Sequence, residues 1–269
     1  MAVTAMAARD AVSAAVDALA AAGCETPRLD AEVLIADALG VDRGALVADP
    51  AMAVPPAAAR VIGERIRRRV AREPVAYILG RKGFRKIELA VDRRVLVPRP
   101  DTELLVEVAL ELESRDRVHD VGTGSGAIAL ALLDERPDLE VSASDVSPAA
   151  VDVARANAAA LGLSIEVSVA RGLPSGEYDL VVANLPYVRE DEWPGLAPEI
   201  RLFEPREALT SGEDGLHAIR ELVEQAPSGL RLALEHAPAQ AAAVRDLLVR
   251  AETRRDLAGL ERVTVGEAR

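Results

Sequence analysis

The chain has 269 residues, enough for one large domain or two smaller ones, and half of them are hydrophobic. A net charge of −12 and a pI near 4.9 argue against a protein that wraps nucleic acid through its phosphates, which needs a basic face, although a local basic patch stays possible. The single cysteine, Cys24, cannot form a disulfide within the chain, which suits a reducing cytosol.

Residues 1 to about 73 are predicted to be helical throughout. The first helix is predicted over Ala5 to Ala22. The segment Met1 to Ala22 lacks both the uninterrupted apolar core of a signal peptide and the length of a membrane span. Thr26, followed by proline, is the expected N-cap of the next helix, and Gly40 is its expected end. A last helix, Ala57 to Arg72, carries a run of arginines, usually a solvated face and alternatively a surface that docks a partner. This pattern predicts a small helical bundle without a catalytic constellation.

The segment from Pro74 to Pro100 has a different pattern. Its short apolar and β-branched runs predict β segments separated by turns, and its last prolines stiffen the chain because each fixes φ. Asp101 or Thr102 then caps a predicted helix, Glu103 to Glu113. The predicted β segments are Val75 to Gly80, Phe84 to Leu89 and Arg94 to Val97.

From Arg117 onward, strand and helix patterns alternate, which predicts a parallel sheet covered by helices on both faces. The predicted strands are Val118–Val121, Val141–Ser144, Ile165–Val169, Asp179–Ala183, Leu230–Leu234 and Glu261–Val265. The predicted helices are Ala127–Leu133, Pro148–Leu161, Gly215–Gln225 and Val244–Ala251. The three histidines of the chain do not cluster at ligand spacing, so no metal site is predicted.

A glycine-rich loop, Asp120 to Ala127, follows the first strand of this alternation. Gly122 and Gly124 allow a tight turn and the close approach of a ligand. Asp145 ends the next strand, where an acidic residue suits the two hydroxyls of a ribose. The loop could serve a dinucleotide, S-adenosylmethionine, or only tight packing, since the glycine pattern alone is a weak signal.

A second motif, Asn184-Leu185-Pro186-Tyr187, follows the strand that ends at Ala183. Pro186 cannot donate a hydrogen bond and stops the strand, so an amide, a free carbonyl and an aromatic ring gather at the carboxyl edge of the sheet. Ligands bind at that edge in open α/β sheets. Together with Asp120, this motif favours S-adenosylmethionine over a dinucleotide, because a dehydrogenase does not need it.

These residues resemble the release factor glutamine methyltransferases, the HemK/PrmC family of protein N5-glutamine methyltransferases, over nearly the whole chain. The two signatures that contain proline and arginine identify this family, whereas the glycine loop is shared by many methyltransferases. The matching segments are Arg72–Gly80 (the connector signature), Val97–Glu103 ("PRPxTE"), Asp120–Ala127 ("DxGTGSGA"), Asn184–Tyr187 ("NPPY"), Ser211–Leu216 and Arg255–Val263.

The resemblance implies three parts: a helical substrate-recognition domain (1–73), a β-hairpin connector (74–100) and a doubly wound, mostly parallel Rossmann-like class I methyltransferase domain (101–269). It implies methyl transfer from S-adenosylmethionine to the amide nitrogen of the glutamine in the Gly-Gly-Gln motif of bacterial class I peptide chain release factors, in the cytoplasm, with no metal, membrane or direct nucleic-acid partner. The implied catalytic residues are Asn184, Pro186 and Tyr187. The implied cofactor-binding residues are Asp120, Gly122, Thr123, Gly124, Ser125, Gly126, Asp145 and Asn184. The implied substrate-binding residues are Phe84, Arg99, Asn184, Leu185, Pro186 and Tyr187.

Three departures from the family pattern bear on this assignment. The segment between Arg250 and Arg254 is short, where the family pattern has an Ala-Gly-aromatic turn before the last strands. Leu185 stands where the family usually has proline, and the resulting tetrad is also that of ribosomal RNA adenine dimethyltransferases. The loop from Ala170 to Tyr178 lacks the residue that usually faces the adenine. The alternatives are therefore a ribosomal-protein glutamine methyltransferase, a nucleic-acid adenine N6-methyltransferase, and a non-catalytic domain that binds the cofactor or a release factor without turnover.

Overall fold

The computed structural model describes residues 6–269, and contacts between its residues divide the chain into two compact units. The helical unit comprises the chain up to Gly80 together with the segment Ala197–Phe203. The sheet unit comprises Arg81–Leu196 and Glu204–Arg269. Nothing in the sequence predicts that a segment from the C-terminal half packs with the N-terminal helices.

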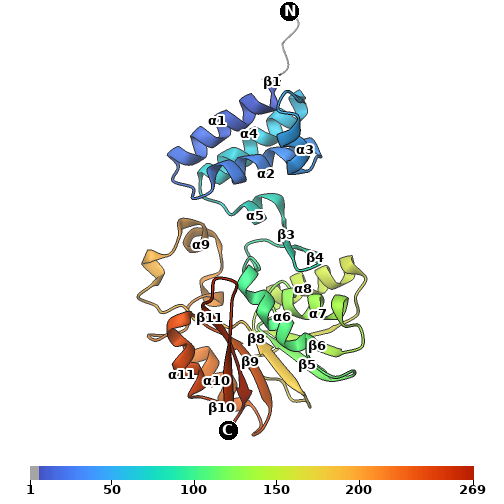
Figure 1. Cartoon of the computed structure of the whole chain (residues 1–269), viewed down its shortest axis with the longest axis vertical. Helices are drawn as coiled ribbons and strands as arrows, with labels where there is room; N and C mark the ends of the chain where they lie inside the picture. Colours follow the sequence, from blue (N-terminus) through green and yellow to red (C-terminus); the bar gives the residue numbers. More distant parts are fainter. Residues whose placement is uncertain (1–5) are drawn as a thin grey trace, which may run out of the picture. The chain divides into compact units, whose positions relative to one another are not determined.

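Three longer helices lie side by side in the helical unit: α1 (Ala8–Ala21), α2 (Pro27–Leu39) and α4 (Pro56–Val70) (Figure 1). Ala11, Ala15 and Leu19 recur every fourth residue along α1 and are buried, so they form the stripe that packs into the core. Ile35 and Ile62 join this core from α2 and α4. The shorter helices of the unit are α3 (Arg43–Ala48), α5 (Val75–Leu79) and α9 (Pro198–Phe203).

Several sequence-based expectations for this unit need correction. The first helix begins at Ala8, because Met6–Ala7 forms strand β1, antiparallel to strand β2 (Ala53–Val54); the expected first residue, Ala5, lies outside the described residues. Thr26 stands at the N-cap of α2, but its hydroxyl donates to Asp30 at 2.8 Å instead of capping the backbone. The predicted β segment Val75 to Gly80 is helix α5 and its C-cap.

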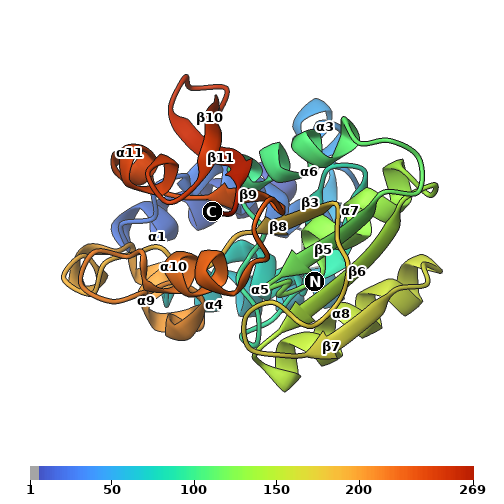
Figure 2. The same cartoon turned by 90° about the horizontal axis from the view of Figure 1, so that it is seen from below.

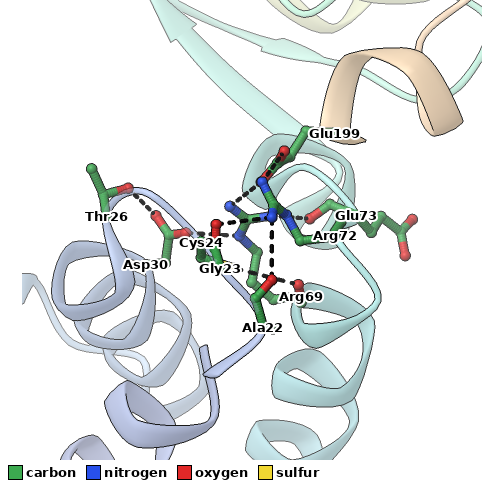
Figure 3. A network of polar contacts seen from close by, with 9 residues as sticks. All are labelled: Ala22, Gly23, Cys24, Thr26, Asp30, Arg69, Arg72, Glu73 and Glu199. Carbon is green, nitrogen blue, oxygen red and sulfur yellow. Dashed lines mark hydrogen bonds and ion pairs between the residues drawn. The ribbon is translucent and has the colours of Figure 1, made fainter. Parts of the chain in front are cut away.

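The arginine run of α4 is largely paired, which the expectation of a solvated face missed. Arg69 is 5% exposed and donates to Asp30 and Glu199, both at 2.7 Å. Arg72, just after α4, contacts the second carboxylate oxygen of Glu199 at 2.6 Å and the Gly23 carbonyl at 2.8 Å (Figure 3). Further pairs in the run are Arg65 with Asp37 and Arg68 with Glu73.

The sheet unit opens with the antiparallel hairpin β3 (Arg81–Phe84) and β4 (Ile87–Ala90), and no strand forms over the predicted Arg94–Val97. Its seven-stranded sheet has the order β10-β11-β9-β8-β5-β6-β7. The five strands from β9 to β7 are parallel to one another. Strand β11 is antiparallel to both of its neighbours, β9 and β10. The predicted mostly parallel, doubly wound sheet is therefore confirmed. The strands are β5 (Arg117–Val121), β6 (Glu140–Asp145), β7 (Glu166–Val169), β8 (Leu180–Ala183), β9 (Arg231–Glu235), β10 (Val249–Arg255) and β11 (Glu261–Glu267).

Helices cover both faces of this sheet (Figures 1 and 2). Val181 and Leu232 face one side and pack with Ile219 and Val244 of the helices there. Leu180 and Val182 flank Val181 in β8, face the other side of the sheet and are also fully buried. Burial on both faces explains the continuous apolar run of this strand. One face carries α6 (Glu103–Leu110), α7 (Ala127–Glu135) and α8 (Pro148–Leu161); the other carries α10 (His217–Gln225) and α11 (Ala241–Arg245).

Two helix boundaries in the sheet unit differ from the sequence expectation. Helix α10 begins at His217, after Gly215, whose φ of +76° is incompatible with a right-handed helix. The predicted helix Val244 to Ala251 ends at Arg245, and Val249–Arg255 is the edge strand β10. A register shift between Val249 and Glu252 disturbs the alternation in this strand and conceals it in the sequence.

Candidate active site at the carboxyl edge of the sheet

A cavity lies at the carboxyl edge of the parallel strands, where the glycine loop after β5, the end of β6 and the tetrad after β8 come together. The sheet order places β5 between β6 and β8, so these three strand ends are neighbours. Among the residues predicted for the site, the cavity is lined by Arg99, Gly122, Thr123, Gly124, Ser125, Asp145, Asn184, Leu185 and Pro186.

The glycine loop is shaped to stay close to a ligand. Gly122 has φ of +76°, and a Cβ there would lie 3.0 Å from the Leu185 side chain. Gly124 has φ of +56° and nothing within 4 Å of its Cβ position, so a side chain there would extend into open space beside the cavity. The two glycines therefore keep the loop tight and bare at the cavity wall. Leu185 in turn fills the space over Gly122, which gives this departure from the family proline a packing role.

Asp120 holds the glycine loop through a hydrogen bond and does not line the cavity. It is fully buried, and Thr123 Oγ1 donates to its Oδ2 at 2.6 Å. Its Oδ1 has no hydrogen-bond partner among the residues described. Burial raises the pKa of Asp120 to about 7, opposed by the Thr123 hydrogen bond and reinforced by the charge of Asp145.

Asp145 lines the cavity and also fixes the loop. Its Oδ2 accepts from the Gly124 N–H at 2.9 Å, and its Oδ1 accepts from the Ser147 N–H at 2.9 Å. Burial raises its pKa above the usual range, although the two backbone bonds favour the charged form. Each carboxylate oxygen keeps a second lone pair, so the side chain can accept from ribose hydroxyls. With the bare glycine loop, this donor and acceptor set fits the adenosyl part of S-adenosylmethionine.

Asn184 also lines the cavity, and its amide is held by a hydrogen bond. Its Nδ2 donates to Thr102 Oγ1 at 3.0 Å, which leaves Oδ1 as the acceptor available to a ligand. Thr102 is 4% exposed, in the turn before α6, and it also lines the cavity. The "PRPxTE" signature and the tetrad therefore meet through one hydrogen bond.

Tyr187 is anchored at both ends and does not line the cavity. Its hydroxyl donates to Glu235 Oε1 at 3.3 Å, and its carbonyl accepts from Gln240 Nε2 at 2.9 Å. Gly215 lies so close that a Cβ there would be 2.1 Å from the same carbonyl. This close approach, with a positive φ, requires glycine at position 215.

Three other predicted residues have positions that the sequence did not specify. Arg99 lines the cavity and is paired with the buried carboxylate of Glu204, which also accepts from the Val97 N–H at 3.1 Å. Phe84 is 2% exposed at the end of β3 and does not line the cavity, because it faces the interior. Gly126 does not line it either: a Cβ there would lie 2.8 Å from Leu130 Cδ1, so this glycine allows the loop to pack on α7.

Sequence reasoning missed Glu235 and Gln240 and gave Thr102 only a capping role. Glu235 ends the buried strand β9, beside β8, and a charged residue at such a strand end was the available signal. The prediction ended that strand one residue early, at Leu234. Gln240 carries no local signal, because its partner Tyr187 lies 53 positions away.

The part of the chain that the structure describes contains neither a candidate metal-binding cluster nor a candidate membrane-spanning helix. Within residues 6–269, no three or more His, Cys, Asp and Glu side chains are grouped so that they could hold a metal ion. Over the same residues, no helix combines the length and the apolar character needed to cross a membrane.

Comparison with known proteins gives matches along both units. Residues 10–80 match the family model "PrmC N-terminal domain", and residues 100–212 match "Methyltransferase small domain". A release factor glutamine methyltransferase of Cereibacter sphaeroides is 42% identical over 268 residues, covering 97% of this chain and 94% of its own. One from Moorella thermoacetica is 44% identical over 253 residues, covering 89% and 88%. Among solved structures, the hMettl16 catalytic domain in complex with the MAT2A 3'UTR hairpin 6 has a TM-score of 0.57 at 14% identity, over 77% of this chain and 82% of that one, a likeness of fold.

Proposed function

This chain belongs to the release factor glutamine methyltransferase family, and we propose that it methylates the side-chain amide nitrogen of the glutamine in the Gly-Gly-Gln motif of bacterial class I release factors. It is a methyltransferase whose cofactor is S-adenosylmethionine. The observation that carries the proposal is the Asn184 amide, fixed by Thr102 with its oxygen available at the wall of the cavity that contains the glycine loop and Asp145.

The reaction requires an orienting site because an amide nitrogen is a poor nucleophile, with its lone pair delocalised into the carbonyl. S-adenosylmethionine supplies an electrophilic methyl group on a sulfonium when it is bound. Asn184 Oδ1 and the Leu185 backbone carbonyl are two acceptors that can hold the substrate NH2 and turn its lone pair toward that methyl. Positioning of this kind supplies up to roughly 7–11 kcal/mol in favourable cases, and the two carbonyl dipoles also face the positive charge that develops on nitrogen.

No strong general base is needed at this site. The nitrogen becomes acidic as it gains the methyl group, so water can take the proton late. Burial, reinforced by the charge of Glu235, raises the pKa of Tyr187 well above its usual value, so its hydroxyl stays protonated and donates to Glu235.

We assign recognition of the release factor body to the helical unit. This assignment is supported by the family match over residues 10–80, and the cavity-lining groups all belong to the sheet unit. It is tested by comparing methylation of an intact release factor with that of a short Gly-Gly-Gln peptide. Comparable kcat/KM values for the two substrates would contradict it.

The decisive experiment for the function offers labelled S-adenosylmethionine with a release factor, ribosomal proteins and RNA in parallel. We expect label on the release factor alone, and loss of that label when the target glutamine is replaced by asparagine, which shortens the reach by one methylene. Label on RNA with none on the release factor would instead support the adenine N6-methyltransferase suggested by Leu185. Cofactor binding in a calorimeter without label on any of the three would indicate a non-catalytic domain.

A further inference from the structure

The charged side chains that line the cavity are Arg94, Arg99, Asp145 and Glu207. Asp145 contacts the glycine loop and suits the ribose hydroxyls, and neither acid can hold an anion. S-adenosylmethionine carries a carboxylate at the end of its methionine chain. A carboxylate that leaves water needs charged or N–H partners, and the two arginines are the cations at the wall of the cavity.

The two arginines differ in how far their guanidinium groups are already engaged. Arg94 forms a two-bond pair with Asp92, through Nε at 2.9 Å and Nη2 at 2.6 Å, and its side chain is half exposed. Arg99 Nη2 donates to Glu204 Oε1, whereas within the described residues its Nε and Nη1 have no hydrogen-bond partner. Because a guanidinium has five N–H donors in a planar fork, Arg99 keeps donors that can bind a carboxylate.

Arg99 lies on the Asn184 side of the cavity. Its carbonyl accepts from the Thr102 N–H at 3.2 Å, and Thr102 Oγ1 in turn accepts from Asn184 Nδ2 at 3.0 Å. The methionine chain and the reactive methyl group are attached to the same sulfur of the cofactor. A cofactor whose adenosyl part contacts Asp145 and whose methyl group faces Asn184 therefore has its methionine chain on the side of Arg99.

Glu204 holds the Arg99 guanidinium in place before any ligand binds. The Glu204 side chain is 2% exposed, and its second oxygen accepts from the Val97 N–H at 3.1 Å, so both carboxylate oxygens are used. The Arg99 side chain is 33% exposed, which leaves it open to a ligand. A guanidinium fixed in this way loses little side-chain entropy when it binds a carboxylate.

We propose that Arg99 binds the methionine carboxylate of S-adenosylmethionine and that Glu204 positions its guanidinium. The family resemblance implies a substrate contact for Arg99, whereas its free donors and its place beside Asn184 assign it to the cofactor. This role rests on the proposed placement of the methyl group at Asn184, but it is tested by cofactor binding alone, without a release factor.

The test measures, by isothermal titration, the dissociation constants of wild type and Arg99→Met for S-adenosylmethionine and two analogues. Decarboxylated S-adenosylmethionine lacks only the carboxylate, and 5′-methylthioadenosine lacks the amino-acid part. For Arg99→Met we expect the dissociation constant of S-adenosylmethionine to rise by on the order of tenfold to a hundredfold, as for the loss of hydrogen bonds to a charged group. The two analogues should bind to the variant no more weakly than to wild type.

Three results would overturn the proposal. The first is an unchanged affinity of Arg99→Met for S-adenosylmethionine, and a raised KM for the release factor in the same variant would then return Arg99 to the substrate. The second is an equal loss of affinity for S-adenosylmethionine and its decarboxylated form, because the carboxylate would then not be the partner. The third is a selective loss in Arg94→Met that is absent from Arg99→Met.

Two further variants separate ligand binding from folding. Since Arg99→Met leaves Glu204 buried without its partner, Arg99→Met/Glu204→Gln removes that charge and keeps an acceptor for the Val97 N–H. The double variant should show the same selective loss, and a wild-type affinity for S-adenosylmethionine in it contradicts the proposal. The matched control is Arg171→Met, an exposed arginine of the sheet unit that is paired with Glu221 away from the cavity, which should bind all the ligands as wild type does.

Failure of the proposed function is a separate result. The release factor would then stay unlabelled while Arg99→Met still lost affinity for S-adenosylmethionine and kept it for the two analogues. That combination would leave the contact between Arg99 and the cofactor intact.

Discussion

The buried carboxylates of the helical unit are paired with guanidinium groups, as is Glu204 of the sheet unit, but two other buried carboxylates of the sheet unit are not. In the helical unit, buried Asp30 and Glu32 each contact a guanidinium, at 2.7 and 2.9 Å. In the sheet unit, Asp120 and Glu235 are buried without an ion pair within the described residues, and each keeps one oxygen without a hydrogen bond. The paired carboxylates contribute to the stability of the fold. The two carboxylates with an unpartnered oxygen lie next to residues that line the cavity, and perturbed pKa values are typical of functional sites.

The largest effect should come from breaking the paired network of Figure 3. Arg69→Ala leaves Asp30 and Glu199 without their shared guanidinium, and removing one partner of a buried pair costs about 3–5 kcal/mol of unfolding free energy. Urea unfolding followed by circular dichroism measures this. The matched control is Arg67→Ala on the same helix, whose exposed pair with Glu64 should contribute at most about 1 kcal/mol. Equal losses from the two variants would contradict the assigned role of Arg69.

The next effect concerns Asn184, at the wall of the cavity. Asn184→Ala removes an acceptor that orients the nucleophile, so kcat should fall by about a hundredfold to a thousandfold, as for the loss of one preorganised hydrogen-bond group. The dissociation constant of S-adenosylmethionine, measured by calorimetry, should change little. Asn184→Asp is the finer variant, because it keeps the acceptor but cannot donate to Thr102. If cofactor affinity and kcat fell together, Asn184 would be a structural residue of the cavity.

An effect of similar size is expected at the cofactor wall. Asp145→Ala should weaken S-adenosylmethionine binding, because each ribose hydroxyl loses a charged acceptor, at about 1.5–3 kcal/mol per bond. Isothermal titration measures the affinity. Asp152→Ala, an exposed change on α8 of the same unit, is the control. Unchanged affinity in Asp145→Ala would remove Asp145 from the proposed ribose site.

The sequence could predict features that depend on neighbouring residues, but not those that depend on partners far away along the chain. The glycine loop and the tetrad were found because their signals are local: an apolar strand, then residues that turn or stop it. Arg69 was misjudged because its partner Glu199 lies 130 positions away, and Glu235 was missed because Tyr187 lies 48 positions away. Charged side chains are expected at the surface by type, and only tertiary contacts show which of them are buried.

Secondary structure failed for a related reason. Val75 to Gly80 has the β-branched and aromatic composition of a strand, yet it forms α5, which packs against α2 and α4. Such composition reports a fit to a half-buried surface more than a backbone preference, so neighbouring elements decide the outcome. The parallel core was predictable because strand and helix patterns alternate over a long stretch, which no single contact overrides.

The last prediction uses the pH dependence of the unfolding free energy to test the protonation state of Asp120, one of the two carboxylates with an unpartnered oxygen. Burial raises the pKa of Asp120 in the folded chain to about 7 from a usual value of 3.8. Between those pH values the folded state retains a proton that the unfolded state has lost, so this group makes the protein less stable as pH rises. The slope is at most about 1.4 kcal/mol per pH unit.

Asp120→Asn keeps the acceptor for the Thr123 hydroxyl but cannot ionise. The unfolding free energy of the variant relative to wild type should therefore increase from pH 5 to pH 7, as measured by urea unfolding at several pH values. The difference between the two proteins isolates Asp120 from the buried His119, whose pKa burial lowers to about 4 and whose contribution to the pH slope has the opposite sign. A difference that stays constant with pH would mean that Asp120 is ionised throughout, compensated like the carboxylates of the helical unit.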